Sequence, residues 1–286
     1  MEVLEELAAR VERLATRPRP RTWPAGLTVH RSTGAGHPAE GHTRPTLALT
    51  VRGAKQTVLG RRTFEYRAGQ YLMATLDLPV TGRVLEADPY LGIGLALRPE
   101  LVAELSVAGG PLPRRGPVHA LAVGDADGAL LDAVVRLLRL TESPADFAVL
   151  AAAAEREVHW RLLSGPLGPT VRQVARLDQR VAVVGRAVRR ITERFDEVVR
   201  VDDLAAHVGV SAPTLNRYFR AVTDLTPLQF QKRLRLQRAR VRLATTTDDV
   251  ASVGHSVGYE SASQFSREYR RLFGVPPSRD TLDPLR

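Results

Sequence analysis

The sequence contains no cysteine, and only two of its 41 basic residues are lysines. Without cysteine the chain can form neither disulfides nor thiolate metal sites, which fits a reducing compartment such as the cytoplasm. The longest unbroken apolar run, residues 147–154, is far shorter than the ~18 residues that a membrane span needs. We therefore exclude a membrane protein and a disulfide-stabilised secreted scaffold, and we expect a cytoplasmic protein.

What is present is an ordinary globular composition with excess positive charge. The 286 residues carry a formal net charge of +10, of which residues 180–286 hold +7 and residues 1–179 hold +3. This length predicts two domains at ~100 to 200 residues each. A locally basic domain attracts nucleic acid because each neutralised phosphate releases counterions. Charge alone fits a solvated arginine-rich surface equally well.

The first half of the chain predicts a β domain preceded by an amphipathic helix. Residues 1–17 space Leu4, Leu7, Val11 and Leu14 at helical intervals, and the proline-rich residues 18–24 then predict an extended arm. Short stretches rich in β-branched and aromatic residues follow, and turn signals separate them. This pattern is typical of a β-sandwich or small barrel. The predicted strands are residues 47–51, 56–59, 63–66, 71–76 and 82–87, with punctuation at Arg52-Gly53, Gly60-Arg61, Ala68-Gly69 and Leu78-Pro79.

From Gly92 onward the pattern indicates helices, with residues 91–104 ambiguous. Helices are predicted over residues 128–140 and 144–163, then a linker at residues 165–169, and helices from residue 171 to the end. One apolar stripe on the first of these helices can serve either a dimer interface or the core. It consists of Leu130, Val134, Leu137 and Leu138.

An internal repeat lies inside the basic region, with one copy at residues 204–219 and a second at residues 253–269. Each copy has the features of a helix-turn-helix. A small residue, Ala205 or Gly254, suits a close helix crossing, and four positions later Gly209 or Gly258 can adopt the left-handed conformation that ends a helix. Ser211 and Ser261 are predicted N-caps of the second helices, and Ser261 with Gln264 matches a capping box.

The spacing of apolar residues predicts which face of each second helix points outward. Leu215 with Phe219, and Phe265 with Tyr269, pack inward at i, i+4. The outward residues are Pro213, Asn216, Arg217 and Arg220 in the first copy, and Ala262, Ser263, Ser266, Arg267 and Arg270 in the second. A pair of helical hairpins packed for stability alone is the alternative. Two copies with an outward arginine favour base reading, because arginine pairs with guanine and asparagine with adenine.

A helix is predicted between the two copies, over residues 227–244. At ~18 residues it spans ~27 Å, long enough to separate two reading heads by roughly one ~34 Å turn of DNA. Its core side is predicted to hold Phe230, Leu234, Ala239 and Leu243. Its solvated or phosphate-facing side is predicted to hold Lys232, Arg233, Arg235, Arg238, Arg240 and Arg242.

Longer motifs in both halves resemble one family. Residues 202–280, with the segments 235–240, 257–261, 264–267 and 273–277, are similar to the DNA-binding domain of AraC/XylS-type transcriptional regulators. Residues 64–71 and 88–92 resemble the N-terminal domain of one branch of that family. Two positions depart from the family pattern: Asp224 stands where glycine is usual at a turn, and Gly254 replaces the usual alanine.

The resemblance implies an α+β chain. Residues 1–170 would form an N-terminal cupin-like β-barrel with flanking helices for effector sensing and dimerisation. Residues 171–286 would form an all-α domain of two helix-turn-helix units, about 202–221 and 250–272, joined by a linker helix. The implied partners are double-stranded DNA in two adjacent major grooves, a small-molecule effector, RNA polymerase and a second copy of the chain. Carried over by motif position, the base-reading candidates are Pro213, Asn216, Arg217, Ala262, Ser263, Ser266 and Arg267.

The rival interpretation is a cupin-type metalloenzyme fused to a helical domain. His30, His37 and His42 fall in a Gly/Pro-rich segment, and His119 and His159 stand alone, which argues against a metal site. Two glycine pairs, at 34–36 and 92–94, are incomplete phosphate-loop motifs. We therefore expect no catalytic residues and no cofactor. Tyr66, Tyr71 and Trp23 are candidates for lining an effector pocket, although aromatic residues at such positions more often belong to a core.

Overall fold

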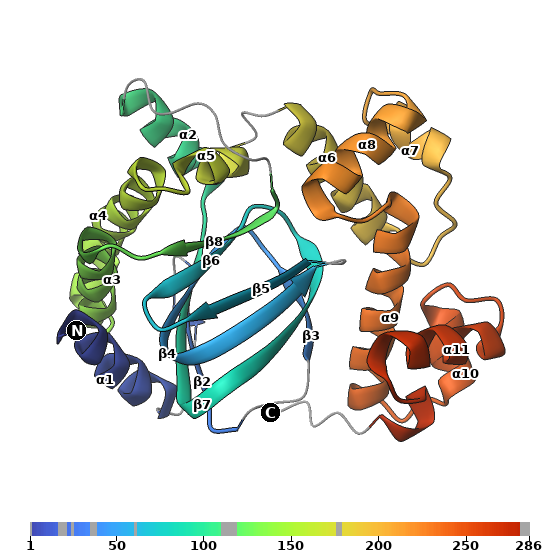
Figure 1. Ribbon diagram of the computed structural model, residues 1–286, viewed down its shortest axis with the longest axis horizontal. Helices are drawn as coiled ribbons and strands as arrows, with labels where there is room; N and C mark the ends of the chain where they lie inside the picture. Colours follow the sequence, from blue (N-terminus) through green and yellow to red (C-terminus); the bar gives the residue numbers. More distant parts are fainter. Residues whose placement is uncertain are drawn as a thin grey trace. The chain divides into compact units, whose positions relative to one another are not determined.

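The computed structural model describes residues 2–16, 22–23, 26–34, 39–59, 62–109, 119–175 and 179–280. The chain divides into two compact units, Met1–Ala182 and Val183–Arg286. The first contains a β-sheet with helices and the second contains helices alone (Figure 1). This agrees with the expected α+β class. Among the described residues, no helix is long and apolar enough to cross a membrane.

The N-terminal helix α1 spans Glu2–Thr16. Leu7, Val11 and Leu14 are buried, and Leu4 packs against the same cluster, so the predicted amphipathic helix is confirmed. Most of the proline-rich arm lies outside the described residues, apart from strand β1, Thr22–Trp23.

The sheet of the first unit has eight strands. Its main path is β1-β2-β7-β4-β6-β8, with β3 paired to β7 and β5 paired to β4. All of these pairs are antiparallel. The remaining bounds are β2 Leu27–Ser32, β3 Ala39–Thr43, β4 Thr46–Leu59, β5 Arg62–Arg67, β6 Gln70–Ala74, β7 Leu78–Ala96 and β8 Leu121–Asp125.

Strands β4 and β7 are long, and each serves two sets of neighbours. The first half of β4 pairs with β6 and its second half pairs with β5, and register shifts lie between Thr50 and Lys55. Gly53 in this stretch has φ +80°, and a Cβ there would collide with the Glu86 carbonyl oxygen. Such bulges bend a strand without ending it. The predicted strands 47–51 and 56–59 are therefore one bent strand, because Arg52-Gly53 marks a bulge and not a turn.

The structure also defines two stretches around β7. The predicted break at Leu78-Pro79 lies directly before that pair, because β6 ends at Ala74 and β7 begins at Leu78. β7 then continues through Gly92 to Ala96, so the first residues of the ambiguous stretch 91–104 belong to a strand. The helix starts later, as α2, Pro99–Ala108. Within the described residues no strand pair closes the sheet, so the barrel implied by the resemblance is an open, cupin-like sheet.

One face of the sheet packs against helices. Leu47, Leu49 and Val51 on β4 share a buried cluster with α1, α2, α3 (Gly128–Leu140) and α4 (Pro144–Ser164). Figure 1 shows α1, α3 and α4 on one side of the sheet. Both predicted helices are confirmed, with Asp127 and Ser143 as N-caps. A short α5, Gly168–Val171, and a 3-10 turn, Arg172–Ala175, follow.

The apolar stripe on α3 belongs to this core. Leu130, Val134, Leu137 and Leu138 are all at most 3% exposed. Of the two roles predicted for the stripe, the structure shows core packing, so α3 does not present it as a dimer surface.

The second unit is built around one long helix, α9, Pro227–Thr245. The pair α7 (Val201–His207) and α8 (Ala212–Thr223) lies toward one end of α9, and the pair α10 (Val250–Ser256) and α11 (Ala262–Phe273) lies toward the other (Figure 1). Helix α6, Gln179–Glu193, precedes them, and a 3-10 turn, Pro277–Arg279, follows. The predicted core side of α9 is confirmed: Phe230, Leu234 and Ala239 are fully buried and Leu243 is partly buried.

Candidate nucleic-acid interface

The first helix-turn-helix is α7-turn-α8, and its turn depends on one glycine. Gly209 has φ +75°, and the turn folds back so that the Val210 N–H donates to the Ala205 carbonyl oxygen over 3.0 Å. Ser211 then caps α8, with its Oγ accepting from the Thr214 N–H over 3.4 Å. The predicted chain reversal and N-cap are both confirmed.

The second helix-turn-helix, α10-turn-α11, repeats this geometry. Gly258 has φ +86°, and the Tyr259 N–H donates to the Gly254 carbonyl oxygen over 3.0 Å. Ser261 Oγ accepts from the Gln264 N–H over 3.3 Å, but the Gln264 side chain donates to Glu268 instead of completing a capping box. A complete capping box lies at the start of α9, between Thr226 and Gln229.

The inward faces of both second helices are as predicted. Leu215, Phe219, Phe265 and Tyr269 are fully buried. Where α10 and α11 cross in the second helix-turn-helix, a Cβ on Gly254 would lie 3.0 Å from the Phe265 ring. Glycine there allows α10 to approach α11 more closely than alanine would, which explains the departure from the family pattern.

The candidate base readers of the first helix-turn-helix lie on the outer side of α8. Pro213, Arg217 and Arg220 are exposed, and Asn216 is half-buried. The Asn216 Nδ2 donates to the Ala212 carbonyl oxygen over 3.1 Å, and the Arg217 guanidinium lies 5.5 Å from the centre of the Tyr218 ring. Arg217 makes no ion pair within the described part of the chain, so its donors are available to a partner.

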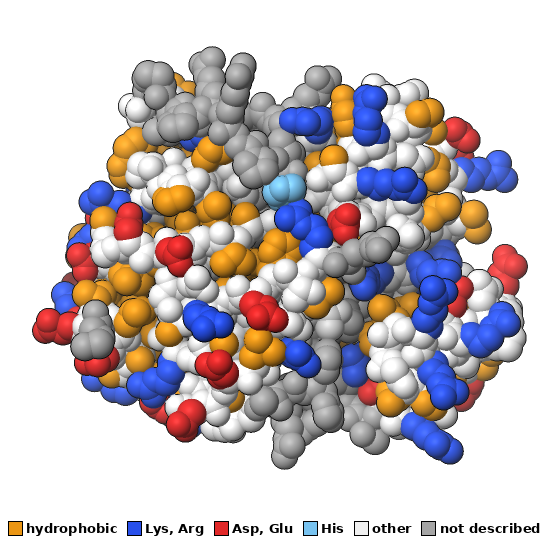
Figure 2. Space-filling model, in the orientation of Figure 1, with side chains coloured by type: hydrophobic (Ala, Val, Ile, Leu, Met, Phe, Trp, Pro, Cys, Tyr) orange, Lys and Arg blue, Asp and Glu red, His pale blue; other side chains and the backbone are white. Residues whose placement is uncertain are grey.

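The corresponding residues of the second helix-turn-helix lie along α11. Ser263, Arg267 and Arg270 are exposed, and Ala262 and Ser266 are half-buried. Ser263 Oγ lies 2.9 Å from Ser261 Oγ at the helix start. Figure 2 shows Lys and Arg side chains gathered over the second unit on the face it displays. None of the predicted outward residues is sunk in the core.

Arg235 does not belong to the predicted phosphate-facing side of α9. Its guanidinium donates to the carbonyl oxygens of Phe195, Asp196 and Glu197 beyond the end of α6, over 2.6 to 2.9 Å, and to that of Gly258 over 2.8 Å. The prediction was wrong because a helical pattern of charges cannot reveal that unsatisfied carbonyl groups lie opposite one of them. Through these hydrogen bonds, Arg235 connects the turn of the second helix-turn-helix to the segment after α6.

Arg240 is the second exception on α9. It is 9% exposed and pairs with Asp280, with 2.8 Å between Nε and Oδ2, and its guanidinium lies 4.6 Å from the centre of the Phe273 ring. Asp280 also accepts from the Tyr269 hydroxyl over 2.8 Å. Lys232 and Arg242 are more exposed and pair with acidic neighbours, at 2.6 Å to Glu268 and 2.9 Å to Asp248 respectively.

Asp224 ends α8 in the left-handed conformation, with φ +60°. Among the described residues it is the only non-glycine with positive φ. The equivalent end of α11 is Gly274, with φ +82°. The departure from glycine at Asp224 therefore strains this helix end, since a Cβ crowds the backbone in the left-handed region.

The histidines are dispersed among the described residues, which hold no cluster of three or more potential metal-ligating side chains. His30 Nε2 lies 3.2 Å from Thr28 Oγ1, and His119 Nδ1 lies 2.9 Å from an Arg62 nitrogen. His159 is buried and accepts from the Arg98 N–H. His37 and the side chain of His42 lie outside the described residues.

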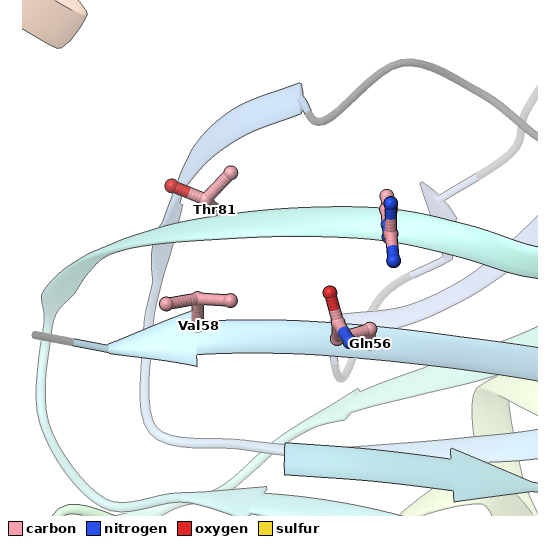
Figure 3. A pocket seen from close by; sticks show the side chains of 4 residues that line it. Gln56, Val58 and Thr81 are labelled. Carbon is pink, nitrogen blue, oxygen red and sulfur yellow. The ribbon is translucent and has the colours of Figure 1, made fainter. Parts of the chain in front are cut away.

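One recess on the sheet has a volume of about 200 Å³ and is lined by Gln56 and Val58 on β4 and by Thr81 and Arg83 on β7 (Figure 3). These residues are opposite one another in the β4–β7 register. The recess holds a single titratable side chain, so it offers no acid–base pair. Of the aromatic pocket candidates, Tyr71 and Trp23 pack in or against the helix-side core.

Comparison with known proteins follows the division of the chain. Residues 25–170 match the model of the AraC-type transcriptional regulator N-terminus, and residues 204–281 match a helix-turn-helix domain model. The first match spans more than half of the chain.

Related regulators align over parts of their length. The HTH-type transcriptional regulator ArgR of Pseudomonas aeruginosa is 33% identical over 153 residues, covering 53% of this chain and 45% of that protein. CdhR of the same species is 42% identical over 78 residues, covering 27% and 23% respectively. The chain thus aligns with less than half of the length of these relatives.

Two solved structures share the fold of nearly the whole chain. An apo ToxT variant from Vibrio cholerae has a TM-score of 0.54 at 11% identity, covering 91% of this chain and 97% of that one. ToxT bound to an unsaturated fatty acid has a TM-score of 0.51 at 12% identity, covering 88% and 92%. These likenesses support the architecture, and the match over residues 25–170 shows that the chain belongs to the family of AraC-type transcriptional regulators.

Proposed function

We propose that this chain regulates transcription by binding specific double-stranded DNA through two adjacent major-groove segments. The observation that carries the proposal is the repetition of one geometry: a positive-φ glycine, a serine N-cap and an exposed arginine on the second helix occur in both units. Recognition helices contact base edges from their first turns. A hairpin packed for stability alone does not require the same outward residues twice.

The proposed base contacts follow the residue chemistry. Arg217 and Arg267 can each bind guanine with two hydrogen bonds, and Asn216 can bind adenine after releasing its bond to Ala212. Pro213 and Ala262 offer apolar contacts to thymine methyl groups, while Ser263 and Ser266 supply hydroxyls. Arg220 and Arg270, about one turn further along their helices, are proposed to contact phosphates.

Helix α9 is proposed to set the distance between the two reading helices. Its 19 residues extend ~28 Å at 1.5 Å per residue, close to the ~34 Å repeat of the major groove. The rings of Phe219 on α8 and Phe230 on α9 lie 5.6 Å apart, and α11 holds α9 through the Lys232–Glu268 pair. Both reading helices are therefore fixed to one rigid element.

The N-terminal unit is proposed to sense a small-molecule effector and to form a homodimer, with RNA polymerase as a further partner and the cytoplasm as the location. The fatty-acid complex of ToxT supports the effector role, since a protein of the same fold binds a small molecule. Sedimentation of the full chain at micromolar concentration tests the homodimer, and a monomer would contradict it.

Selection of genomic fragments by the purified full chain tests the DNA proposal and yields the operator. On that operator, Arg217→Ala and Arg267→Ala should each weaken binding by about 1 to 3 kcal/mol and relax discrimination at one base position. Arg136→Ala is the matched control, because this exposed arginine pairs with Glu157 in the first unit. It removes the same charge and should leave DNA affinity unchanged.

Random DNA of equal length separates base reading from phosphate contact. Equal losses on operator and random DNA would show that Arg217 and Arg267 contact phosphates alone. Failure of the full chain to enrich any sequence would refute specific recognition.

A further inference from the structure

The sheet of the first unit holds a group of polar side chains that DNA binding does not use. We name it the Lys55 cluster, and it consists of Thr50, Lys55, Thr57, Tyr66 and Tyr90. The two tyrosines and two threonines are each at most 6% exposed. The Tyr66 hydroxyl lies 3.1 Å from Thr57 Oγ1, and the Tyr90 hydroxyl lies 3.5 Å from Thr50 Oγ1.

Strand register places Lys55 in this group. Lys55 on β4 is directly opposite Tyr66 on β5, and its Nζ lies 5.9 Å from the centre of the Tyr90 ring on β7. Because side chains alternate along a strand, Lys55 and Thr57 share one face. Gln56 and Val58, which line the recess of Figure 3, share the other.

Glycine makes room for this arrangement. A Cβ on Gly92 would lie 2.7 Å from the Tyr90 hydroxyl. The glycine pair at 92 and 94, which resembled part of a phosphate loop, therefore lies within a strand where it accommodates side chains.

Within the described part of the chain no carboxylate pairs with the half-buried Lys55, and desolvation lowers its pKa with no anion to oppose the shift. Burial also raises the pKa of Tyr66 and Tyr90, so both phenols stay neutral near pH 7. The other lysine of the chain, Lys232, pairs with Glu268 at 2.6 Å. An ammonium that loses part of its water is costly unless an anion pairs with it, and a ring face compensates this cost only in part.

We infer that the Lys55 cluster binds the carboxylate of an amphipathic monocarboxylic acid, with the Lys55 ammonium as counter-ion and the tyrosine hydroxyls as hydrogen-bonding partners. A single cation matches a single negative charge, whereas phosphate groups favour forked arginine donors. Phe64 and Val84 are opposite Thr57 and Lys55 in register, and they supply apolar surface for the rest of the acid. This inference rests on the proposed effector role of the first unit.

The chain's two lysines allow a direct test. Full-length protein labelled with ¹³C-lysine carries two labelled side chains, which NMR can follow during titration with octanoate. The Lys55 Cε signal should shift with saturation and its pKa should rise, because a bound carboxylate favours the charged form. The Lys232 signal should stay in place, and 1-octanol and octylamine should produce no comparable change.

Two variants separate ligand binding from structural support. Lys55→Met should weaken octanoate binding about tenfold or more, since it removes a charged partner. It should also raise the unfolding temperature of the ligand-free protein, because it removes an unpaired and partly desolvated charge. A lysine with a merely structural role would lower that temperature on removal. Lys55→Arg keeps the charge and should retain more binding than Lys55→Met.

Contrary results are equally clear. A Lys55 signal unaffected by octanoate at millimolar concentration, or shifted equally by 1-octanol, would overturn the inference. Operator affinity measured in the same samples keeps the two proposals distinct. Octanoate binding at Lys55 without any change in DNA affinity would support the ligand site and refute effector control. A different effector that changes the DNA affinity of wild type and of Lys55→Met equally would support effector control and refute a role for the Lys55 cluster in it.

Discussion

Gly209 and Gly258 have the same backbone conformation but different surroundings. Both have positive φ at the turn of a helix-turn-helix unit. A Cβ on Gly209 would meet no atom within 4 Å, whereas one on Gly258 would collide with the Asp196 carbonyl oxygen and lie 2.7 Å from Arg235 Nη2. Sequence motifs show the shared requirement for glycine, but the crowding around one of the two arises from Arg235 and the segment after α6.

Alanine substitutions should separate conformation from crowding. Gly209→Ala should lower the free energy of unfolding by about 1 to 2 kcal/mol, the cost of a left-handed non-glycine residue. Gly258→Ala should cost about 1 to 3 kcal/mol more, because it also forces packed atoms apart. Urea denaturation followed by circular dichroism measures both, with Gly209→Ala as the matched control. Equal losses of unfolding free energy in the two variants would show that the hydrogen bonds of Arg235 can shift to accommodate the new methyl group at almost no cost.

Helices α2 and α4 are joined by a buried histidine. His159 on α4 is fully buried; its Nε2 accepts from the Arg98 N–H at 3.1 Å, and its Nδ1 lies 2.8 Å from the Glu155 carbonyl oxygen. Nδ1 must therefore carry the proton of a neutral ring. Burial lowers the pKa of His159, and the nearby Arg98 charge adds to that effect.

This pairing predicts a loss of stability in mild acid. The unfolded chain binds a proton at His159 near pH 6.5, whereas the folded chain does so only at lower pH. The neutral His159 ring therefore makes its full contribution to the free energy of unfolding above about pH 6.5. That contribution declines as the pH falls below this value. Both tryptophans of the chain, Trp23 and Trp160, lie in the first unit. Urea denaturation followed by tryptophan fluorescence at pH 7.5 and 5.5 thus measures this unit.

His159→Gln is the control for this measurement. Glu155 faces the same region, and burial raises its pKa, so its titration stabilises the folded state as the pH falls. Subtracting the pH dependence of His159→Gln removes the Glu155 contribution. An unchanged pH dependence in the variant would rule out His159 as its source.

For the molecule as a whole, the proposed mode of DNA binding requires two independent reading helices on one rigid helix. Arg217 lies on α8 and Arg267 on α11, at different ends of α9 (Figure 1). If each reads its own groove segment, their contributions to affinity should be additive. The double variant Arg217→Ala/Arg267→Ala should then lose the sum of the two single losses within about 0.5 kcal/mol.

Fluorescence anisotropy on the selected operator, at one fixed salt concentration, measures this additivity. Fixed salt matters because phosphate contacts make the affinity depend on ionic strength. A double variant no weaker than either single variant would show that the two helices act on DNA as one coupled element. The Arg136→Ala control should behave as wild type in the same assay.

Local patterns in the sequence predicted the helix-turn-helix units well. The glycine turns, the serine caps and the buried positions Leu215, Phe219, Phe265 and Tyr269 depend on interactions between residues a few positions apart. Periodicity and capping chemistry record such short-range interactions directly. The placement of the outward arginines follows from the same helical period.

The sheet and the buried charges could not be predicted in this way. The union of two predicted strands into β4, the extension of β7 past Gly92, and the inward positions of Arg235 and Arg240 all depend on segments distant in sequence. The Lys55 cluster likewise arises from three strands meeting through register. Short-range chemistry is written along the chain, whereas strand pairing and the burial of a charge depend on which distant groups the folded chain brings together.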